Sequence, residues 1–138
     1  MAVETTLVLV KPDGMRRGLA GEILARLEHR GFELRGARLL KITRPLAQEH
    51  YAEHKGKPFY ADLVSFITSG PVLALAVRGE SAVSVVRTMM GATNPLDSAP
   101  GTIRGDYALE LSENIVHGSD SKANARRELG LFFPDGLA

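Results

Sequence analysis

Short apolar segments alternate along this chain with segments of helical periodicity, and this alternation constrains the fold more than any other feature. Four segments are predicted to be strands, and they cover residues 5–10, 32–42, 72–77 and 115–117. Helices are predicted over 19–29, 82–90 and 121–132, with a further pair beginning near Pro45 and Pro58. The resulting order β-α-β-αα-β-α-β-α, with strands of about five residues, favours one sheet covered by helices, in the α+β class. The pattern does not give the order of the strands in the sheet.

Three connecting or irregular segments carry local signals. Gly36 permits a bulge in the second strand, and the period-2 pattern of that strand predicts one shared face, formed by Phe32, Leu34, Leu40 and Ile42. Residues 11–14, Lys-Pro-Asp-Gly, are predicted to form a turn after the first strand. Residues 91–106 contain three glycines and two prolines without apolar periodicity, which predicts a long loop of the kind that usually carries function.

The composition limits the classes of function. A chain of 138 residues is expected to form a single domain over residues 1–138. A net charge of +1 argues against a dedicated nucleic-acid or membrane binder, which would need a basic excess. The absence of cysteine fits a reducing compartment, and neither a bilayer-spanning segment nor a signal-peptide pattern is present. We therefore expect a cytoplasmic protein without membrane contact.

Cationic side chains bracket the predicted loop. Arg87, Thr93 and Arg104 offer two planar charged forks and a hydroxyl, which are the groups that phosphate oxygens need. Surface arginines that bridge the loop to its own carbonyls are the alternative. Lys11 favours the phosphate interpretation, because it follows a strand directly and lies in a turn, where side chains are commonly presented to ligands.

Several familiar catalytic motifs are absent or incomplete. The chain has no G-x-x-x-x-G-K-[ST] phosphate loop, no kinase-type G-x-G-x-x-G and no G-x-S-x-G nucleophile elbow. Tyr51 follows His50, so H-E-x-x-H is not formed. The inverted order H-x-x-E-H is met by His50, Glu53 and His54, but no third ligand is evident, and a polar helix face explains the match more simply.

His117 is the remaining candidate for chemistry, within the segment N-I-V-H-G-S-D at residues 114–120. A neutral imidazole is a good nucleophile toward phosphorus at neutral pH, because its unperturbed pKa is about 6.5. Its ring needs a partner on the nitrogen that does not attack, and both Asp120 and Glu128 are candidates. A purely structural hydrogen-bonding role is the alternative for a lone histidine.

Five blocks in this sequence resemble the nucleoside diphosphate kinase family. They are L-V-L-V-K-P-D-G (7–14), H-Y-A-E-H-K-G-K-P-F (50–59), F-I-T-S-G-P-V (66–72), G-A-T-N-P-L-D-S-A-P-G-T-I-R-G-D (91–106) and N-I-V-H-G-S-D (114–120). The resemblance implies a ferredoxin-like fold with a four-stranded antiparallel sheet covered by helices. It also implies a ping-pong transfer of the γ-phosphoryl group between nucleoside triphosphates and diphosphates, with Mg²⁺ bound to the nucleotide and broad base specificity.

The resemblance assigns roles residue by residue. His117 would become phosphorylated, Glu128 would orient its ring, and Lys11 would help to stabilise the transferred charge. Leu111 stands where many members have a branched residue, often valine. The implied nucleotide contacts are Arg87, Thr93, Arg104 and His54 to phosphates, Lys11 and Asn114 to sugar hydroxyls and phosphate, and Phe59, Tyr51 and Leu111 around the base.

The resemblance also implies a homo-oligomer, since family members assemble from dimers into hexamers or tetramers. We expect a hexamer, with residues 91–106 contributing to subunit packing. The main alternative function is a non-catalytic ferredoxin-like nucleotide or nucleic-acid binding module. The presence of His117 together with Glu128 argues against that alternative, because binding alone needs neither.

Overall fold

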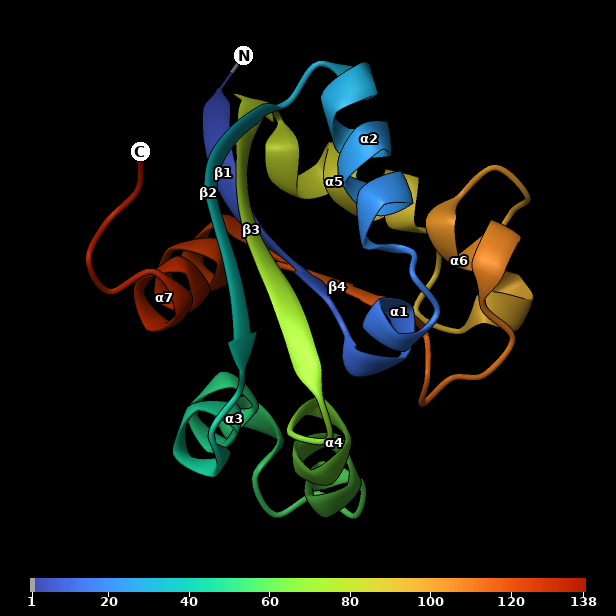
Figure 1. Ribbon diagram of the computed structural model, residues 1–138, viewed down its shortest axis with the longest axis vertical. Coiled ribbons are helices and arrows are strands. Elements are labelled where there is room, and N and C mark those ends of the chain that lie inside the picture. The colour runs from blue at the N-terminus through green and yellow to red at the C-terminus, as the bar shows by residue number, and fades with distance from the viewer. Residues whose placement is uncertain (1) are drawn as a thin grey trace.

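The computed structural model describes residues 2–138 and contains one antiparallel sheet of four strands in the order β2-β3-β1-β4 (Figure 1). This arrangement confirms the expected α+β class and ferredoxin-like fold. The strands are β1 (Val3–Val10), β2 (Glu33–Lys41), β3 (Pro71–Glu80) and β4 (Val116–Gly118). The first and third strands therefore form the centre of the sheet, and the short β4 pairs with the carboxyl half of β1.

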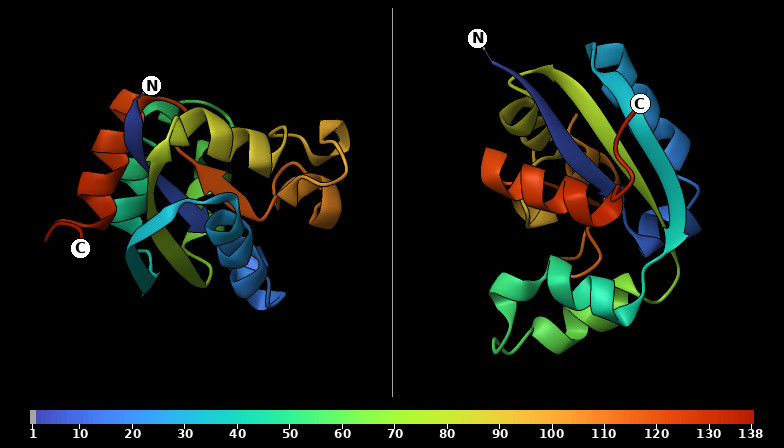
Figure 2. Two further views of the ribbon diagram at one scale, coloured as in Figure 1. Left: turned by 90° about the horizontal axis from the view of Figure 1, so that it is seen from above. Right: turned by 90° about the vertical axis from the view of Figure 1, so that its left-hand side faces the viewer.

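Helices cover both faces of the sheet, as the views in Figure 2 show. Two helices, α2 (Ala20–Arg30) and α5 (Ala82–Met90), lie on one face, and α7 (Lys122–Phe132) lies on the other. The pair α3 (Arg44–His50) and α4 (Tyr60–Ile67) packs at the end of the sheet where β2 ends and β3 begins. The shorter elements are α1 (Pro12–Arg16), α6 (Ile103–Tyr107) and two 3₁₀ turns, η1 (Ala52–His54) and η2 (Pro95–Asp97).

The two faces of the sheet form two separate apolar clusters because side chains alternate along each strand. In β1, Val8 and Val10 pack with α2 and α5, whereas Leu7 and Leu9 pack with residues of α3, α4 and α7. All four side chains are buried, and each stabilises the fold by roughly 1.5–3 kcal/mol relative to an exposed position. A strand residue thus faces either α5 or α7, and this choice decides which groups can meet in a site.

A bulge in β2 changes which face its side chains occupy. The register between β2 and β3 shifts between Leu34 and Gly36, so one extra residue separates the two halves of β2. Phe32 consequently packs with the α2 cluster, whereas Leu40 and Ile42 pack with the opposite cluster. The expected bulge at Gly36 is confirmed, but the predicted shared face was wrong, because one inserted residue reverses the alternation beyond it.

Two segments predicted to be irregular contain helix. Residues 12–16 form α1, which Pro12 can begin because a helix's first turn needs no hydrogen bond from that nitrogen. Within 91–106, η2 and the start of α6 interrupt the predicted loop. The side chain of Asn94 accepts from the Leu96 amide in η2, and that of Thr102 accepts from the Gly105 amide in α6.

The two histidines of the H-x-x-E-H match do not share a helix. His50 is the last residue of α3, and His54 belongs to the separate turn η1. Pro58 precedes α4 rather than lying inside its first turn, since Phe59 caps that helix. Over residues 2–138, no helix has the length and apolar character needed to cross a membrane.

Candidate active site

His117 faces the α7 side of the sheet as a consequence of strand alternation. It is the central residue of β4 and pairs with Leu9 of β1. Its neighbour Val116 packs in the α5 cluster, and a side chain on Gly118 would collide with Met90 of α5. The His117 imidazole is therefore directed to the opposite face, where α7 passes over β1.

Glu128 of α7 holds one nitrogen of the His117 ring. Its Oε1 lies 3.0 Å from His117 Nε2 and also accepts a hydrogen bond of 2.6 Å from Ser119 Oγ. Burial alone would raise the pKa of Glu128, but these hydrogen bonds and the charge of His117 lower it to about 2. Asp120, the other sequence candidate, instead accepts from Asn124 Nδ2 at 2.6 Å. The ionised Glu128 therefore favours the tautomer with the proton on Nε2, which leaves the Nδ1 lone pair available.

The residue two positions before His117 has a strained backbone that α1 supports. Ile115 has a φ of 75°, a region that β-branched residues rarely adopt. Its amide donates to Asp13 Oδ2 at 3.1 Å, and its carbonyl accepts from the Lys11 amide at 2.8 Å. Sequence reasoning missed Asp13, because the K-P-D-G signal of residues 11–14 pointed to a turn rather than to this long-range contact.

Three cationic side chains share a cleft of about 220 Å³ with His117. They are Lys11, Arg87 and Arg104, and within residues 2–138 none forms an ion pair with a carboxylate. Burial and then repulsion from Arg104 lower the pKa of Lys11 to about 8. Burial and then repulsion from Arg87 lower the pKa of Arg104 to about 10. The cleft is thus electropositive, and a bound anion would reduce the repulsion among its three cations.

Arg104 also holds the local backbone together. Its guanidinium donates to the carbonyls of Asn114, Gly91 and Val116, at 3.3, 2.9 and 2.7 Å. The bridging of backbone carbonyls that the sequence offered as one interpretation is therefore present. The side chain also lines the cationic cleft, and the phosphate contact stays a prediction. Arg87 makes one such bond, to the Gly118 carbonyl at 3.2 Å.

The structure brings most of the other expected residues to the same cleft. Asn114 accepts a 2.8 Å hydrogen bond from Lys11 Nζ through its Oδ1 and donates to the Thr93 carbonyl. Two predicted base contacts are absent from the cleft lining: Leu111, whose side chain is 60% exposed, and Phe59, which is 46% exposed. Phe59 still adjoins the cleft, because its ring centroid lies 5.3 Å from that of His54. The expected residues that line the cleft are Lys11, Tyr51, His54, Arg87, Thr93, Arg104, Asn114, His117 and Glu128.

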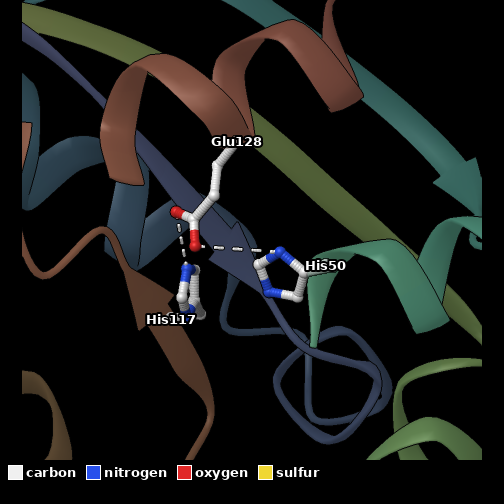
Figure 3. Close-up of side chains that lie close together, drawn as sticks. All are labelled: His50, His117 and Glu128. Carbon is white, nitrogen blue, oxygen red and sulfur yellow. Dashed lines mark hydrogen bonds and ion pairs between the residues drawn. The ribbon is translucent and has the colours of Figure 1, made fainter. Parts of the chain in front are cut away.

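His50 is a buried neighbour of His117 that was not expected in the site. Its ring packs edge-on against His117, with centroids 4.7 Å apart, and Figure 3 shows both imidazoles directed toward Glu128. Burial and then the charge of His117 lower the pKa of His50 to about 3, so the ring is neutral. The H-x-x-E-H match pointed to His50, but its partners proved to be His117 and Glu128 instead of Glu53 and His54.

The fold and the site together define an α+β protein whose cleft places three cationic side chains, which could hold a polyanion, beside the imidazole of His117. A family model described as nucleoside diphosphate kinase matches residues 4–137. The chain belongs to the nucleoside diphosphate kinase family, and this confirms the resemblance carried by the five sequence blocks.

Individual relatives agree with this membership over nearly the full chain. A nucleoside diphosphate kinase of Rubrobacter xylanophilus is 58% identical over 131 residues, which cover 95% of this chain and 98% of the relative. One from Pelotomaculum thermopropionicum is 55% identical, with 95% and 88% covered. The solved structure of a halophilic nucleoside diphosphate kinase from Halobacterium salinarum in complex with CDP matches with a TM-score of 0.96 at 51% identity, covering 99% of this chain and 92% of that one.

Proposed function

We propose that this member of the nucleoside diphosphate kinase family transfers the γ-phosphoryl group reversibly from a nucleoside triphosphate to a nucleoside diphosphate through a phosphohistidine at His117. One observation carries the assignment of the nucleophile. The His117 ring is held at Nε2 by Glu128, in a cleft whose three cations have no carboxylate partner among residues 2–138. A neutral nucleophile beside unpaired cations is suited to a substrate that brings several negative charges.

In this proposal, because Glu128 engages Nε2 of the His117 ring, the attack is made by the other ring nitrogen, Nδ1. Its lone pair forms a bond to the γ-phosphorus while the bond from that phosphorus to the bridging oxygen breaks, and the nucleoside diphosphate leaves. The ring then carries a positive charge, which the adjacent Glu128 carboxylate stabilises. In the second half-reaction a terminal phosphate oxygen of another diphosphate attacks the same phosphorus and the N–P bond breaks. One residue thus serves as acceptor and donor in turn.

The cations stabilise the charge that spreads over the transferred group. Phosphoryl transfer passes through a loose transition state, so positioning and electrostatic stabilisation supply most of the catalysis. Lys11, Arg87 and Arg104 would take this role, with the Thr93 hydroxyl as a neutral donor, and their position in the cleft lining supports it. The nucleotide base would stack on Phe59, near Tyr51, His54 and Leu111, and stacking on a ring face accepts any base.

Mg²⁺ would enter with the nucleotide rather than occupy a cage of protein ligands. The carboxylates of the described cleft are Glu53, Asp120 and Glu128, and Glu128 is engaged by His117 and Ser119. Glu53 and Asp120 remain as the side chains that could contact the ion. This fits Mg²⁺, which commonly combines one or two carboxylates with water and substrate phosphates. When bound, the ion neutralises charge on the phosphates.

A labelling experiment tests the proposed function directly. Pure protein mixed with γ-labelled ATP and Mg²⁺, without an acceptor, should acquire an acid-labile, alkali-stable label, as expected for a phosphohistidine. Added GDP or CDP should then remove the label as the corresponding triphosphate, whereas adenosine, which lacks the accepting phosphate, should not. Folded protein that binds nucleotide and acquires no label would contradict the mechanism and favour a binding module.

The pKa of Lys11 predicts that nucleotide binding takes up a proton in mildly alkaline solution. In the protein without nucleotide, Lys11 has a pKa of about 8. Bound phosphates should raise this pKa, because they favour the charged form. At a pH between the pKa of Lys11 without nucleotide and its higher pKa with nucleotide, binding should therefore take up as much as about one proton. The affinity for nucleotide should fall as the pH rises through this range. Calorimetry at pH 9 in buffers of different ionisation enthalpy measures the uptake. The Lys11→Arg variant is the matched control, since its charge is permanent, and equal uptake in both proteins would exclude Lys11 as the source.

We also propose a homo-oligomer, a hexamer in preference to a tetramer, that acts in the cytoplasm as a single-domain protein. Exposed apolar side chains support self-association. They include Leu96 within residues 91–106, which is 73% exposed, and Leu39 on the edge strand β2, which is 66% exposed. Sedimentation equilibrium would distinguish a hexamer from a tetramer.

A further inference from the structure

We propose that His50, His117 and Glu128 form a binding site for a zinc-like divalent transition-metal ion, and that the bound ion switches off the nucleophile. One nitrogen from each histidine and one oxygen from the carboxylate all lie within 4.8 Å of one another. The binding is inferred from this geometry alone, and only the inhibition rests on the proposed function of His117.

His50 is the observation that points to a ligand. Its side chain is 1% exposed, yet neither ring nitrogen has a hydrogen-bond partner in the described chain. Buried polar groups are nearly always paired, so such an imidazole calls for an explanation. Its Nδ1 is directed at Glu128 Oε2 from 3.8 Å, which is too long for a hydrogen bond (Figure 3). Packing against Tyr51 and Phe132 would be served equally well by an apolar ring.

The spacing suits a small ion after slight side-chain rotation. Zinc binds nitrogen and oxygen at about 2.0–2.2 Å, so tetrahedral ligands lie roughly 3.3–3.5 Å apart. The two nitrogen-to-oxygen distances lie on either side of that range, with 3.0 Å from His117 Nε2 to Glu128 Oε1 and 3.8 Å from His50 Nδ1 to the other carboxylate oxygen, Oε2. The three donor atoms all lie within 4.8 Å of one another, so small rotations of the side chains bring them to the spacing of a metal site. The three residues also line the cleft, which gives the ion a route of entry and a fourth position for water.

The donor set selects the class of metal. Two imidazoles and one carboxylate suit zinc, cobalt or copper, whereas Mg²⁺ prefers oxygen ligands alone. Ser119 Oγ donates to Glu128 at 2.6 Å and would orient the carboxylate as an outer partner. The proposed transition-metal site is therefore distinct from the place that Mg²⁺ would occupy with the nucleotide.

Binding would inactivate His117 by moving its proton. In the metal-free ring the ionised Glu128, 3.0 Å from Nε2, favours the tautomer that carries its proton on Nε2. A metal ion that takes the Nε2 lone pair requires the proton on Nδ1, so the ring stays neutral and releases no proton. Nδ1 then has no lone pair with which to attack phosphorus. The ion should thus lower kcat and the yield of phosphoenzyme without occupying the position of the base.

The experiment combines a binding measurement with phosphoenzyme formation. Co²⁺ replaces Zn²⁺ as a spectroscopic probe, and the protein of residues 1–138 should show the intense visible absorption of tetrahedral Co²⁺, which Zn²⁺ should abolish. Protein loaded with Zn²⁺ and freed of excess metal should form at least about 10-fold less phosphoenzyme during a brief exposure to Mg-ATP, and a chelator should restore it. These readouts are compared in wild type, His50→Leu, His50→Gln and the control His29→Gln, which alters an exposed histidine on α2.

Loss of His50 should weaken metal binding by at least about 100-fold, more than the loss of an outer partner usually does, whereas His29→Gln should bind like wild type. His50→Leu should fold, since it replaces an unpaired buried polar group with an apolar one, and His50→Gln provides a second test if it does not. Metal affinity that is unchanged in the His50 variants, or phosphoenzyme formation unaffected by bound Zn²⁺, would overturn the proposal. Failure of the proposed function would look different, because metal-free protein would then form no phosphoenzyme at all.

Discussion

The His117→Ala variant is expected to lose at least about 10⁴-fold in kcat/KM for phosphoryl transfer between nucleotides, as removal of a covalent nucleophile does in other enzymes. The neighbouring groups are poor substitutes, because Glu128 is hydrogen-bonded to Ser119 and the centre of the His50 ring lies 4.7 Å from that of the removed imidazole. Steady-state turnover and labelling with γ-labelled ATP measure the loss. Nucleotide affinity should change little, since Lys11, Arg87 and Arg104 remain in the cleft.

Two comparisons separate loss of the nucleophile from loss of structure. The free energy of unfolding of His117→Ala should fall by only about 1 kcal/mol, the net worth of one hydrogen bond. His29→Ala removes an exposed histidine of α2 and should retain wild-type turnover. A folded His117→Ala protein that keeps turnover within 10-fold of wild type would show that the phosphoryl group does not pass through this residue.

The alternation of strands and helices could be predicted because the spacing of apolar residues within each short segment shows which face of it is buried. The predicted helix over 82–90 and the strand at 5–10 agree with α5 and with β1 to within a few residues. The face of β2 could not be predicted beyond its bulge, because the sequence permits an extra residue at Gly36 without revealing how the register is restored. The helices α1 and α6, which begin within the predicted turn at 11–14 and the predicted loop at 91–106, were missed because proline and glycine indicate turns as readily as helix starts.

A site residue could be predicted where it lies inside a recognisable sequence motif. His117 and Arg104 lie in blocks that resemble the family, Arg87 lies near the end of the predicted helix over 82–90, and the structure brings all three to one cleft. Long-range partners carry no such signal. Spacing could not choose between Asp120 and Glu128, and nothing local connects His50, at the end of α3, with β4 and α7. Those contacts follow from which face of the sheet each element covers.

Arg104→Lys is expected to lower kcat/KM by about 10²–10³-fold, comparable to the loss of one donor that stabilises transition-state charge, although the positive charge remains. It should also lower the free energy of unfolding by about 2–3 kcal/mol, because an ammonium cannot reproduce three divergent bonds and buried carbonyls lose their donor. Those carbonyls belong to Gly91, Asn114 and Val116, so Arg104 ties the 91–106 segment to the strand that presents His117.

Urea denaturation and steady-state kinetics measure the two effects of Arg104→Lys, and Arg87→Lys is the matched control. Arg87 lines the same cleft but makes only one carbonyl bond, to Gly118 at 3.2 Å. Its replacement should lower turnover while costing less than about 1 kcal/mol of stability. If the two variants lose equal stability, Arg104 does not clamp the loop. If only Arg104→Lys loses turnover, the effect comes from displaced backbone and not from charge at the phosphates. A loss of turnover in both, with a large loss of stability in Arg104→Lys alone, is the result that the geometry of this cleft predicts.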